Sequence, residues 1–338
     1  MQKQALSKEE KILGGFLGAA AGDAMGAATE TRSIDDIREK FGGYVKTFLT
    51  PPDDVFAAGR PAGSVTDDFS LIKHLAEALI KSGGAVTDAV AEEAVLTWYD
   101  EGTYLAMVGP SIVECVARLR NLPFEKRYPN ITIDNFATTN GSGMRILPVG
   151  LLSGGDIDKA IGDAVVICRP THNNISSMSG GCAVAAGVAA AMRENATSLS
   201  IVEAGLKGAR YGEKIGAHVA VPSVYRRISL AVEIGLRSDD FERTIYDLNA
   251  LIGTGLSAYQ SIPAAFGIVA ASKGDAMTGL FMGVNAGDDA DTVACMVGSM
   301  LGTLQGAGAY PAEYIDVIDR ANDYDIRGLA KRFSAIVK

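Results

Sequence analysis

The chain has 338 residues, 48% of them hydrophobic, which is enough apolar material for one large domain or two ordinary ones. Its 31 basic and 40 acidic residues give a formal net charge of -9, and the sequence contains no basic stripe. This composition excludes a disordered chain and argues against a nucleic-acid partner, but it is compatible with a small phosphorylated ligand.

The chain shows no membrane or secretion signal. Its apolar stretches are broken by Gly, Ser or charge before they reach about 20 residues, and Met1 to Gln4 contain no charged-then-apolar leader. We therefore expect a soluble, cytoplasmic protein without a membrane partner. The cysteines have no paired spacing, so we expect reduced core residues at Cys115, Cys168, Cys182 and Cys295.

The first predicted element is a helix, because Ile12, Phe16 and Ala20 recur at helical spacing. The small residues of Gly14-Gly15-Phe16-Leu17-Gly18-Ala19-Ala20-Ala21-Gly22 would let another helix approach its backbone closely. The segment from Tyr44 to Leu49, bounded by Gly and Pro pairs, could form a short edge hairpin, and the sequence gives little other sign of strand.

Three later segments also have helical patterns. Apolar residues recur at helical spacing from Leu71 to Leu79 and from Val293 to Leu304. The stretch from Gly180 to Met192 is small and apolar on nearly all sides, which predicts a helix buried in the centre. We predict an all-α bundle that forms a single domain over residues 1–338.

Two acidic clusters stand at the starts of predicted helices. The first is Thr66-Asp67-Asp68, and the second includes Asp289-Ala290-Asp291-Thr292. Thr and Asp before an apolar helix are ordinary N-caps, since their oxygens accept the free amide hydrogens of the first turn. One carboxylate suffices for a cap, however, and adjacent carboxylates repel each other. The excess charge points to a bound cation.

The ligand types in the two clusters limit the choice of cation. Carboxylate and hydroxyl oxygens suit Mg²⁺ or Mn²⁺ better than zinc, which prefers nitrogen and sulfur. An isoprenoid synthase would need a second acid four residues after the first Asp of a cluster. Leu71 and Thr292 stand at that distance from Asp67 and Asp288, so the sequence disfavours this alternative.

Several other residues have both a structural and a functional interpretation. Glu30 is either solvent-facing or part of a site, whereas Asp23 in its Gly-rich surroundings is expected to bond backbone amides. The loop Asn140-Gly141-Ser142-Gly143 is either a simple turn or a backbone cradle for phosphate or ribose. His172 is either a structural residue or a ligand contact, and Arg145 either holds a phosphate or caps a helix.

In combination, these segments resemble the ADP-ribosylglycohydrolase family. Five blocks follow the family order: Gly14-Gly15-Phe16-Leu17-Gly18 through Gly22-Asp23-Ala24-Met25-Gly26 to Glu30; Thr66-Asp67-Asp68; Asn140-Gly141-Ser142-Gly143-Met144-Arg145; Thr171-His172; and Gly287-Asp288-Asp289-Ala290-Asp291-Thr292. Each block alone is a weak signal, but five in this order are specific.

The resemblance implies a compact orthogonal all-α bundle with two Mg²⁺ ions, or Mn²⁺, in a central cleft. Carried over by position, it implies metal ligands at Thr66, Asp67, Asp68, Asp289, Asp291 and Thr292, a catalytic acid at Glu30, and substrate contacts at Asn140, Gly141, Ser142, Gly143, Met144 and His172. Two such ions would bind the ribose hydroxyls and lower the pKa of a water that attacks the anomeric carbon.

The chain departs from the family pattern at the substrate end. Phe69 follows the first acidic cluster where the family usually has Thr, and Met107 lies where members acting on protein-linked ADP-ribose often carry an acid. Three hypotheses therefore stand: hydrolysis of an ADP-ribosyl bond on a protein or small molecule, hydrolysis of a simpler N-riboside such as a nucleoside, and a non-catalytic riboside-binding or structural relative.

Overall fold

The computed structural model describes residues 6–125 and 137–338. Met1 to Gln4, where we expect no leader, lie outside the described residues. Over the described ranges the protein is all-α and contains no β-strand, as predicted from the sequence. The helices are α1 (Lys8–Gly26), α2 (Ile34–Phe41), α3 (Asp67–Lys81), α4 (Asp88–Glu101), α5 (Pro110–Leu119), α6 (Gly141–Met144), α7 (Leu147–Leu152), α8 (Ile157–Cys168), α9 (Ile175–Ala191), α10 (Ser198–Gly212), α11 (Val224–Arg237), α12 (Phe241–Leu251), α13 (Ala258–Ala271), α14 (Ala276–Val284), α15 (Ala290–Gln305), α16 (Glu313–Asn322) and α17 (Ile326–Ser334), with 3₁₀ turns η1 (Leu105–Met107) and η3 (Ala307–Ala309).

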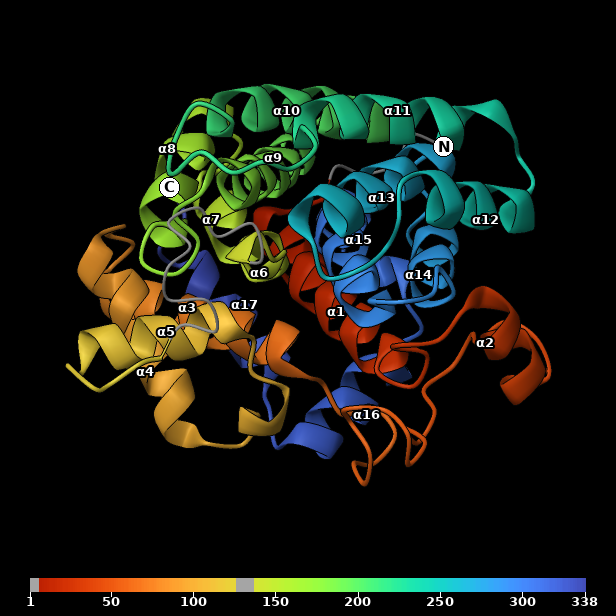
Figure 1. Ribbon diagram of the computed structural model, residues 1–338, viewed down its shortest axis with the longest axis horizontal. Coiled ribbons are helices and arrows are strands. Elements are labelled where there is room, and N and C mark those ends of the chain that lie inside the picture. Colours follow the sequence, from red (N-terminus) through yellow and green to blue (C-terminus); the bar gives the residue numbers. More distant parts are fainter. Residues whose placement is uncertain (1–5, 126–136) are drawn as a thin grey trace.

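Helices α1 and α15, from opposite ends of the sequence, pack along each other in the centre of the molecule (Figure 1, red and blue). Their contact face on α1 carries a glycine on every turn. A Cβ atom at Gly18 would lie 2.3 Å from the Gly298 carbonyl oxygen, and one at Gly22 would lie 2.2 Å from that of Ala294. Only glycine fits at these positions, which confirms the close backbone approach expected from the small residues.

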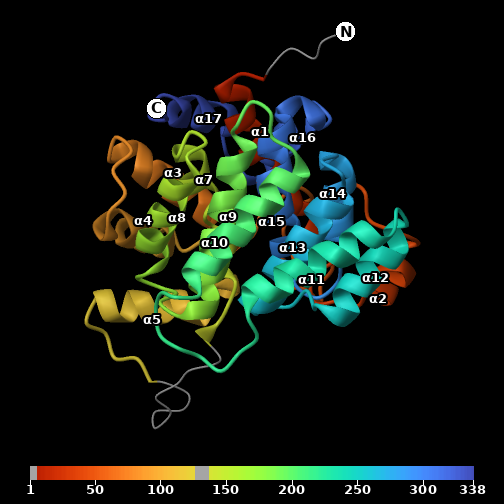
Figure 2. The ribbon, with the colours of Figure 1, turned by 90° about the horizontal axis from the view of Figure 1, so that it is seen from above.

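The predicted buried helix is α9, whose residues from Ser176 to Ala191 are all buried. It packs against both α10 and α15 (Figure 2). Its C-terminal end is held by Lys11 of α1, whose Nζ donates to the carbonyls of Ala191 at 2.7 Å and Arg193 at 2.9 Å. A lysine at a helix C-terminus satisfies carbonyls that have no partner within the helix.

The interpretation of Tyr44 to Leu49 as an edge hairpin is wrong. The segment is irregular, and the Asn285 side chain takes the place of a partner strand by accepting from the Val45 amide and donating to the Val45 carbonyl, both at 2.8 Å. Tyr44 and Phe48 pack on aromatic rings of later helices. A distant amide side chain thus satisfies the backbone groups that a hairpin would have paired.

Three further predictions concern the cysteines, membrane-spanning helices and the number of domains. All four cysteines are buried and free, as expected. In the described part of the chain, no helix has the length and apolar character needed to cross a membrane. The single-domain organisation of residues 1–338 stays a prediction.

Candidate functional site

Helix α3 begins at the first acidic cluster because Asp23 and Thr66 cap it together. Thr66 is the N-cap residue, and its Oγ1 accepts from the Asp68 amide at 3.3 Å. The buried Asp23 carboxylate accepts from the Thr66 and Phe69 amides at 2.9 to 3.0 Å. Asp23 therefore bonds backbone amides, as expected, and at the same time attaches α1 to the first turn of α3.

Helix α15 begins at the second acidic cluster, where a strained turn precedes it. Asp288 has a φ of 56°, and its backbone exchanges hydrogen bonds with Thr31 and Arg32 in the turn that follows α1. Its side chain is exposed, whereas Asp289 and Asp291 are each only 4% exposed. The turn thus presents two acids of this cluster to the interior and one to solvent.

The two clusters and the end of α1 meet in two overlapping groups of carboxylates. Oxygens of Asp23, Asp68 and Asp291 lie within 4.8 Å of one another, and so do oxygens of Glu30, Asp289 and Asp291. Asp291 belongs to both groups. Three oxygens at such spacing can coordinate one cation, so the arrangement offers two neighbouring cation positions that share Asp291.

Within the described residues, the carboxylates in this region have no ion-pair partner. Six acids meet here, namely Asp23, Glu30, Asp67, Asp68, Asp289 and Asp291, and no Lys or Arg of the described residues forms an ion pair with any of them. The Oδ2 atom of Asp68 is buried without a hydrogen-bond partner in the described part of the protein. Charges buried in this way are costly unless a cation neutralises them.

The pKa values of these acids reflect that cost. Burial, together with the charge of Asp289, raises the pKa of Glu30 to about 8. Burial and the charge of Asp23 raise the pKa of Asp67 to about 8, and burial raises the pKa of Asp289 to about 6. For Asp68 and Asp291, burial and neighbouring acids raise the pKa well above its ordinary value. A divalent cation would reverse these shifts by favouring the ionised carboxylates.

We expect the metal-free protein to lose stability as the pH rises. The pKa values of Glu30 and Asp289 lie above their ordinary values of 4.5 and 3.8 in the folded state, so the folded protein binds protons more tightly than the unfolded chain. Their contribution is complete below the ordinary values and is lost as the pH passes through about 6 to about 8. In a chelator, the melting temperature should decrease as the pH rises from about 5 to about 9. Mg²⁺ should restore the melting temperature most at the alkaline end of this range. A flat profile in the chelator would contradict this expectation.

A cavity of about 230 Å³ opens beside the carboxylates. The predicted metal ligands Thr66, Asp67, Asp68, Asp289, Asp291 and Thr292 all line it, as do Glu30, Asn140, Gly141, Met144 and His172. Ser142 and Gly143 do not line it. The Ser142 hydroxyl donates to the Ser177 carbonyl at 2.7 Å, and a Cβ at Gly143 would meet Ile262, so both residues face neighbouring helices. The structure therefore brings together all the predicted site residues except these two, and their roles stay predictions.

Hydrogen bonds of Asn140 and His172 hold side chains of the site in place. The Asn140 amide donates to the Asp289 carboxylate and to the Ser261 hydroxyl. His172 is hydrogen-bonded through Nε2 to Thr139 at 3.0 Å and through Nδ1 to Thr171 at 2.7 Å. Burial, then the charge of Arg145, lowers the pKa of His172 well below its ordinary value, so this imidazole is neutral.

Arg145 lies behind the loop, out of the cavity. It is buried and donates to the Thr171 hydroxyl and, at 3.5 Å, to the Ile167 carbonyl in the last turn of α8. This contact agrees with the helix-capping interpretation rather than with phosphate binding. Arg145 also fixes Thr171, which in turn fixes His172.

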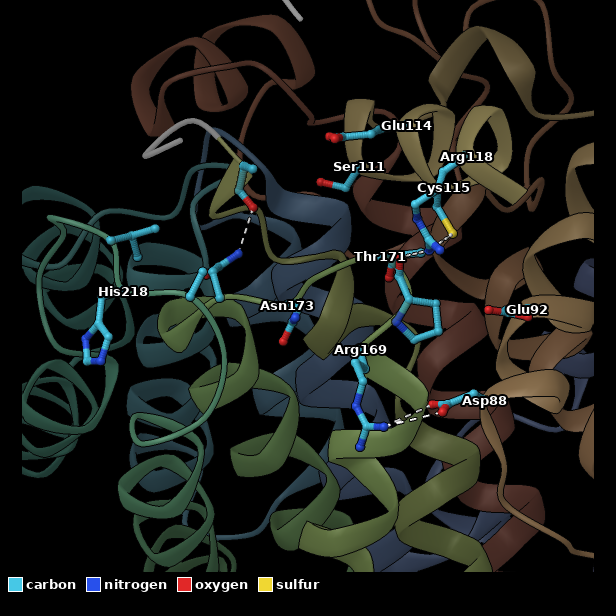
Figure 3. Close-up of a pocket in the computed structure, with 15 residues that line it drawn as sticks. Asp88, Glu92, Ser111, Glu114, Cys115, Arg118, Arg169, Thr171, Asn173 and His218 are labelled. Atoms are coloured by element: carbon cyan, nitrogen blue, oxygen red, sulfur yellow. Dashed lines mark hydrogen bonds and ion pairs between the residues drawn. The ribbon is translucent and has the colours of Figure 1, made fainter. Parts of the chain in front are cut away.

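A second cavity, of about 540 Å³, lies next to the first (Figure 3). Ser111 lines both, and its hydroxyl lies 3.4 Å from that of Thr139. Figure 3 shows Arg169 beside Asp88 in the lining of this cavity, where the two form an ion pair at 3.3 Å. The two cavities are therefore neighbours that share Ser111, and a hydrogen-bonded series of Ser111, Thr139 and His172 lines the smaller one.

Most of the side chains at the mouth of the smaller cavity have no signal in the sequence. Phe56 and Leu256 belong to irregular loops, where a single apolar residue has no pattern that reveals its role. Met107 was noted only for the acid that it replaces. Asp23 was assigned a structural role, and the geometry adds it to a group that can bind a cation.

Comparison with known proteins agrees with the resemblance seen in the sequence. The profile described as ADP-ribosylglycohydrolase matches residues 4–337. The chain belongs to the ADP-ribosylglycohydrolase family. Its fold is therefore that of a family whose name denotes a glycosyl hydrolase activity.

Individual relatives are consistent with this family assignment, but the two curated ones are uncharacterized and therefore identify no specific activity. The uncharacterized protein YegU of Escherichia coli K12 is 27% identical over 327 residues and 96% of each chain. An uncharacterized protein of Archaeoglobus fulgidus is 28% identical over 300 residues and 87% of each chain. A solved structure titled ADP-ribosylglycohydrolase-related protein complex has a TM-score of 0.68 at 22% identity and covers 98% of this chain and 99% of its own, which shows the shared fold.

Proposed function

We propose that this protein is a glycohydrolase that depends on two Mg²⁺ ions, or Mn²⁺, and cleaves the bond at the anomeric C1 of an ADP-ribosyl group, on a protein or a small molecule. The observation that supports this most is the pair of buried carboxylate groups that share Asp291 and open onto the cavity. Family membership supplies the class of bond.

The residues present fit divalent cations. The donor set consists of oxygens only, and the unpartnered Oδ2 of Asp68 is a buried carboxylate oxygen free to coordinate. Thr66, Asp67, Asp68, Asp289, Asp291 and Thr292 would hold the ions, with Asp23 and Glu30 close enough to contribute. When bound, such ions orient the ribose hydroxyls and make a water molecule more acidic.

The protein's own groups would then position the substrate and move protons. Glu30 lines the cavity beside Asp289 and Asp291, and a carboxyl group there can accept a proton from the attacking water or stabilise positive charge at C1. Asn140 holds Asp289 in place by its hydrogen bond. The neutral His172, fixed by two threonines, offers an uncharged surface to the substrate.

A second candidate function is the hydrolysis of a simpler N-riboside such as a nucleoside. The size of the cavity favours it, because about 230 Å³ is below the 300 to 1,000 Å³ that is roughly typical of ligand pockets. An ADP-ribosyl substrate would have to extend out of this cavity, for example toward the larger one beside it.

An assay with both substrate groups tests the proposal. We expect release of ADP-ribose or ribose from a panel of ADP-ribosylated peptides, small ADP-ribosyl compounds and nucleosides when Mg²⁺ or Mn²⁺ is present, and no release in excess EDTA. The control is the same panel after the metal is restored to the chelated protein. If no substrate is cleaved and calorimetry detects no metal binding, a non-catalytic riboside-binding or structural role replaces the proposal.

A further inference from the structure

The cavity of about 230 Å³ has an apolar part that the proposed chemistry does not use. Beside the carboxylates, it is lined by the side chains of Phe56, Met107, Val108, Pro110, Ile112 and Leu256. These residues come from three segments: the irregular loop after Pro52, the stretch from η1 to the start of α5, and the loop before α13. We refer to these six side chains as the apolar wall.

Two members of the apolar wall are large and exposed. Phe56 is 61% exposed and Leu256 is 64% exposed, although both line the cavity, so they lie at its mouth. Exposed apolar side chains around a concave site are typical of ligand contact, because the ligand removes them from water. Neither residue is needed for the buried core of the described protein.

The apolar wall is connected to the rest of the site. The Leu256 carbonyl accepts from the Asn140 amide at 2.9 Å, so the loop that carries Leu256 is attached to the loop that binds Asp289. The Met107 amide donates to the Tyr104 carbonyl at 3.0 Å, and the Tyr104 ring stacks on the buried Trp98. Hydrogen bonds therefore hold the backbone of Leu256 and of Met107.

The charges around the cavity restrict what can pack on this wall. Among the described residues that line it, none is Lys or Arg, and the only carboxylates are those that would hold the cations or, in Glu30, act beside them. His172 is neutral. A cationic leaving group such as a guanidinium would therefore find no carboxylate of its own among the lining residues, whereas an uncharged ring needs none.

We propose, building on the function proposed above, that the group cleaved from C1 is an uncharged flat ring that packs against Phe56, Met107 and Leu256. In the reaction, a water oxygen bonds to C1 while the bond from C1 to the ring substituent breaks. The ring leaves with the electron pair of that bond, and the proton of the water passes to a carboxylate or to solvent. The three apolar residues thereby determine specificity for the leaving group.

Four substrates test this proposal by pairing two glycones with two leaving groups. Ribose and ADP-ribose are each linked to 4-nitrophenol, an uncharged ring, or to the guanidinium of arginine, and each is assayed as both anomers. Because 4-nitrophenol is intrinsically a better leaving group than arginine, the test is the differential effect of a wall substitution on the two leaving groups and not the ratio of the wild-type kcat/KM values. Phe56→Ala should lower kcat/KM for the 4-nitrophenyl substrates by about tenfold and leave the arginine substrates unchanged.

An equilibrium measurement separates binding from turnover. Calorimetry with 4-nitrophenyl 1-thioriboside, which resists hydrolysis, should show affinity weakened about tenfold by Phe56→Ala and little changed by Phe124→Ala. Phe124 is a matched control because it is 40% exposed and does not line the cavity.

The outcomes distinguish this proposal from the proposed function. A Phe56→Ala variant with equal losses on both leaving groups would overturn the ring-binding role while the glycohydrolase function stands. Absence of turnover on all four substrates and on the panel of ADP-ribosylated peptides, small ADP-ribosyl compounds and nucleosides, with metal present, would overturn the proposed function itself.

Discussion

Asp68→Asn is expected to abolish turnover while the metal-free protein becomes more stable. Asp68 is buried, its Oδ1 accepts from the Thr292 hydroxyl at 3.3 Å, and its Oδ2 has no partner in the described residues. Asn keeps the shape but cannot ionise, in a cluster where burial and nearby acids raise the pKa of Asp68 well above its ordinary value and so disfavour its ionised form. Loss of several kcal/mol of transition-state stabilisation by the metal corresponds to a decrease in rate of about a thousandfold or more.

Two measurements check this result. Steady-state kinetics with saturating Mg²⁺ should show the loss of turnover, and thermal unfolding in a chelator should show a melting temperature above that of the wild type. Asp316→Asn, an exposed acid in the first turn of α16, is the matched control and should alter neither. Wild-type turnover by Asp68→Asn would mean that this carboxylate holds no catalytic ion.

Gly22→Ala should destabilise the protein by about 3 kcal/mol and reduce its activity, because the α1–α15 contact has no room for a methyl group. The new Cβ would lie 2.2 Å from the Ala294 carbonyl oxygen and 2.4 Å from the Ala294 carbonyl carbon. The helices would have to move apart, and Asp23 on α1 would then move relative to Asp291 on α15.

Gly162→Ala in α8 is the matched control for this change. Nothing lies within 4 Å of the Cβ it would add, so alanine should stabilise the helix by about 0.5 to 1 kcal/mol. Denaturant unfolding of both variants gives the comparison. Gly22→Ala with wild-type stability would show that the two helices can separate at no cost.

The parts of the fold that the sequence predicted are those with local patterns. Helical spacing of apolar residues identified α1, α3 and α15, and the uniformly small and apolar stretch identified α9 as the buried helix. The segment at Tyr44 was misread because the group that satisfies its backbone, Asn285, lies 240 residues away. A single sequence contains no signal for such a distant hydrogen bond.

The candidate site was predictable to the extent that chemistry restricts residue type. Adjacent acids in excess of what a helix cap needs marked Asp67 and Asp68, and the structure brings them to a shared cavity with Asp289 and Asp291. The apolar wall could not be predicted, because Phe56 and Leu256 are isolated apolar residues in loops. Ser142, by contrast, has the right type and position in the loop, yet its hydroxyl faces α9.

The pairing of α1 with α15 also has a consequence for synthesis of the chain. The glycine face of α1 leaves the ribosome well before its partner α15, which ends at Gln305. Until then, α1 has no surface to pack against along that face, and Asp23 can meet Asp68 but not Asp291. The nascent chain therefore completes neither its central helix pair nor the carboxylate group around Asp291 until α15 has been synthesised, and a truncation before α15 leaves an incomplete site.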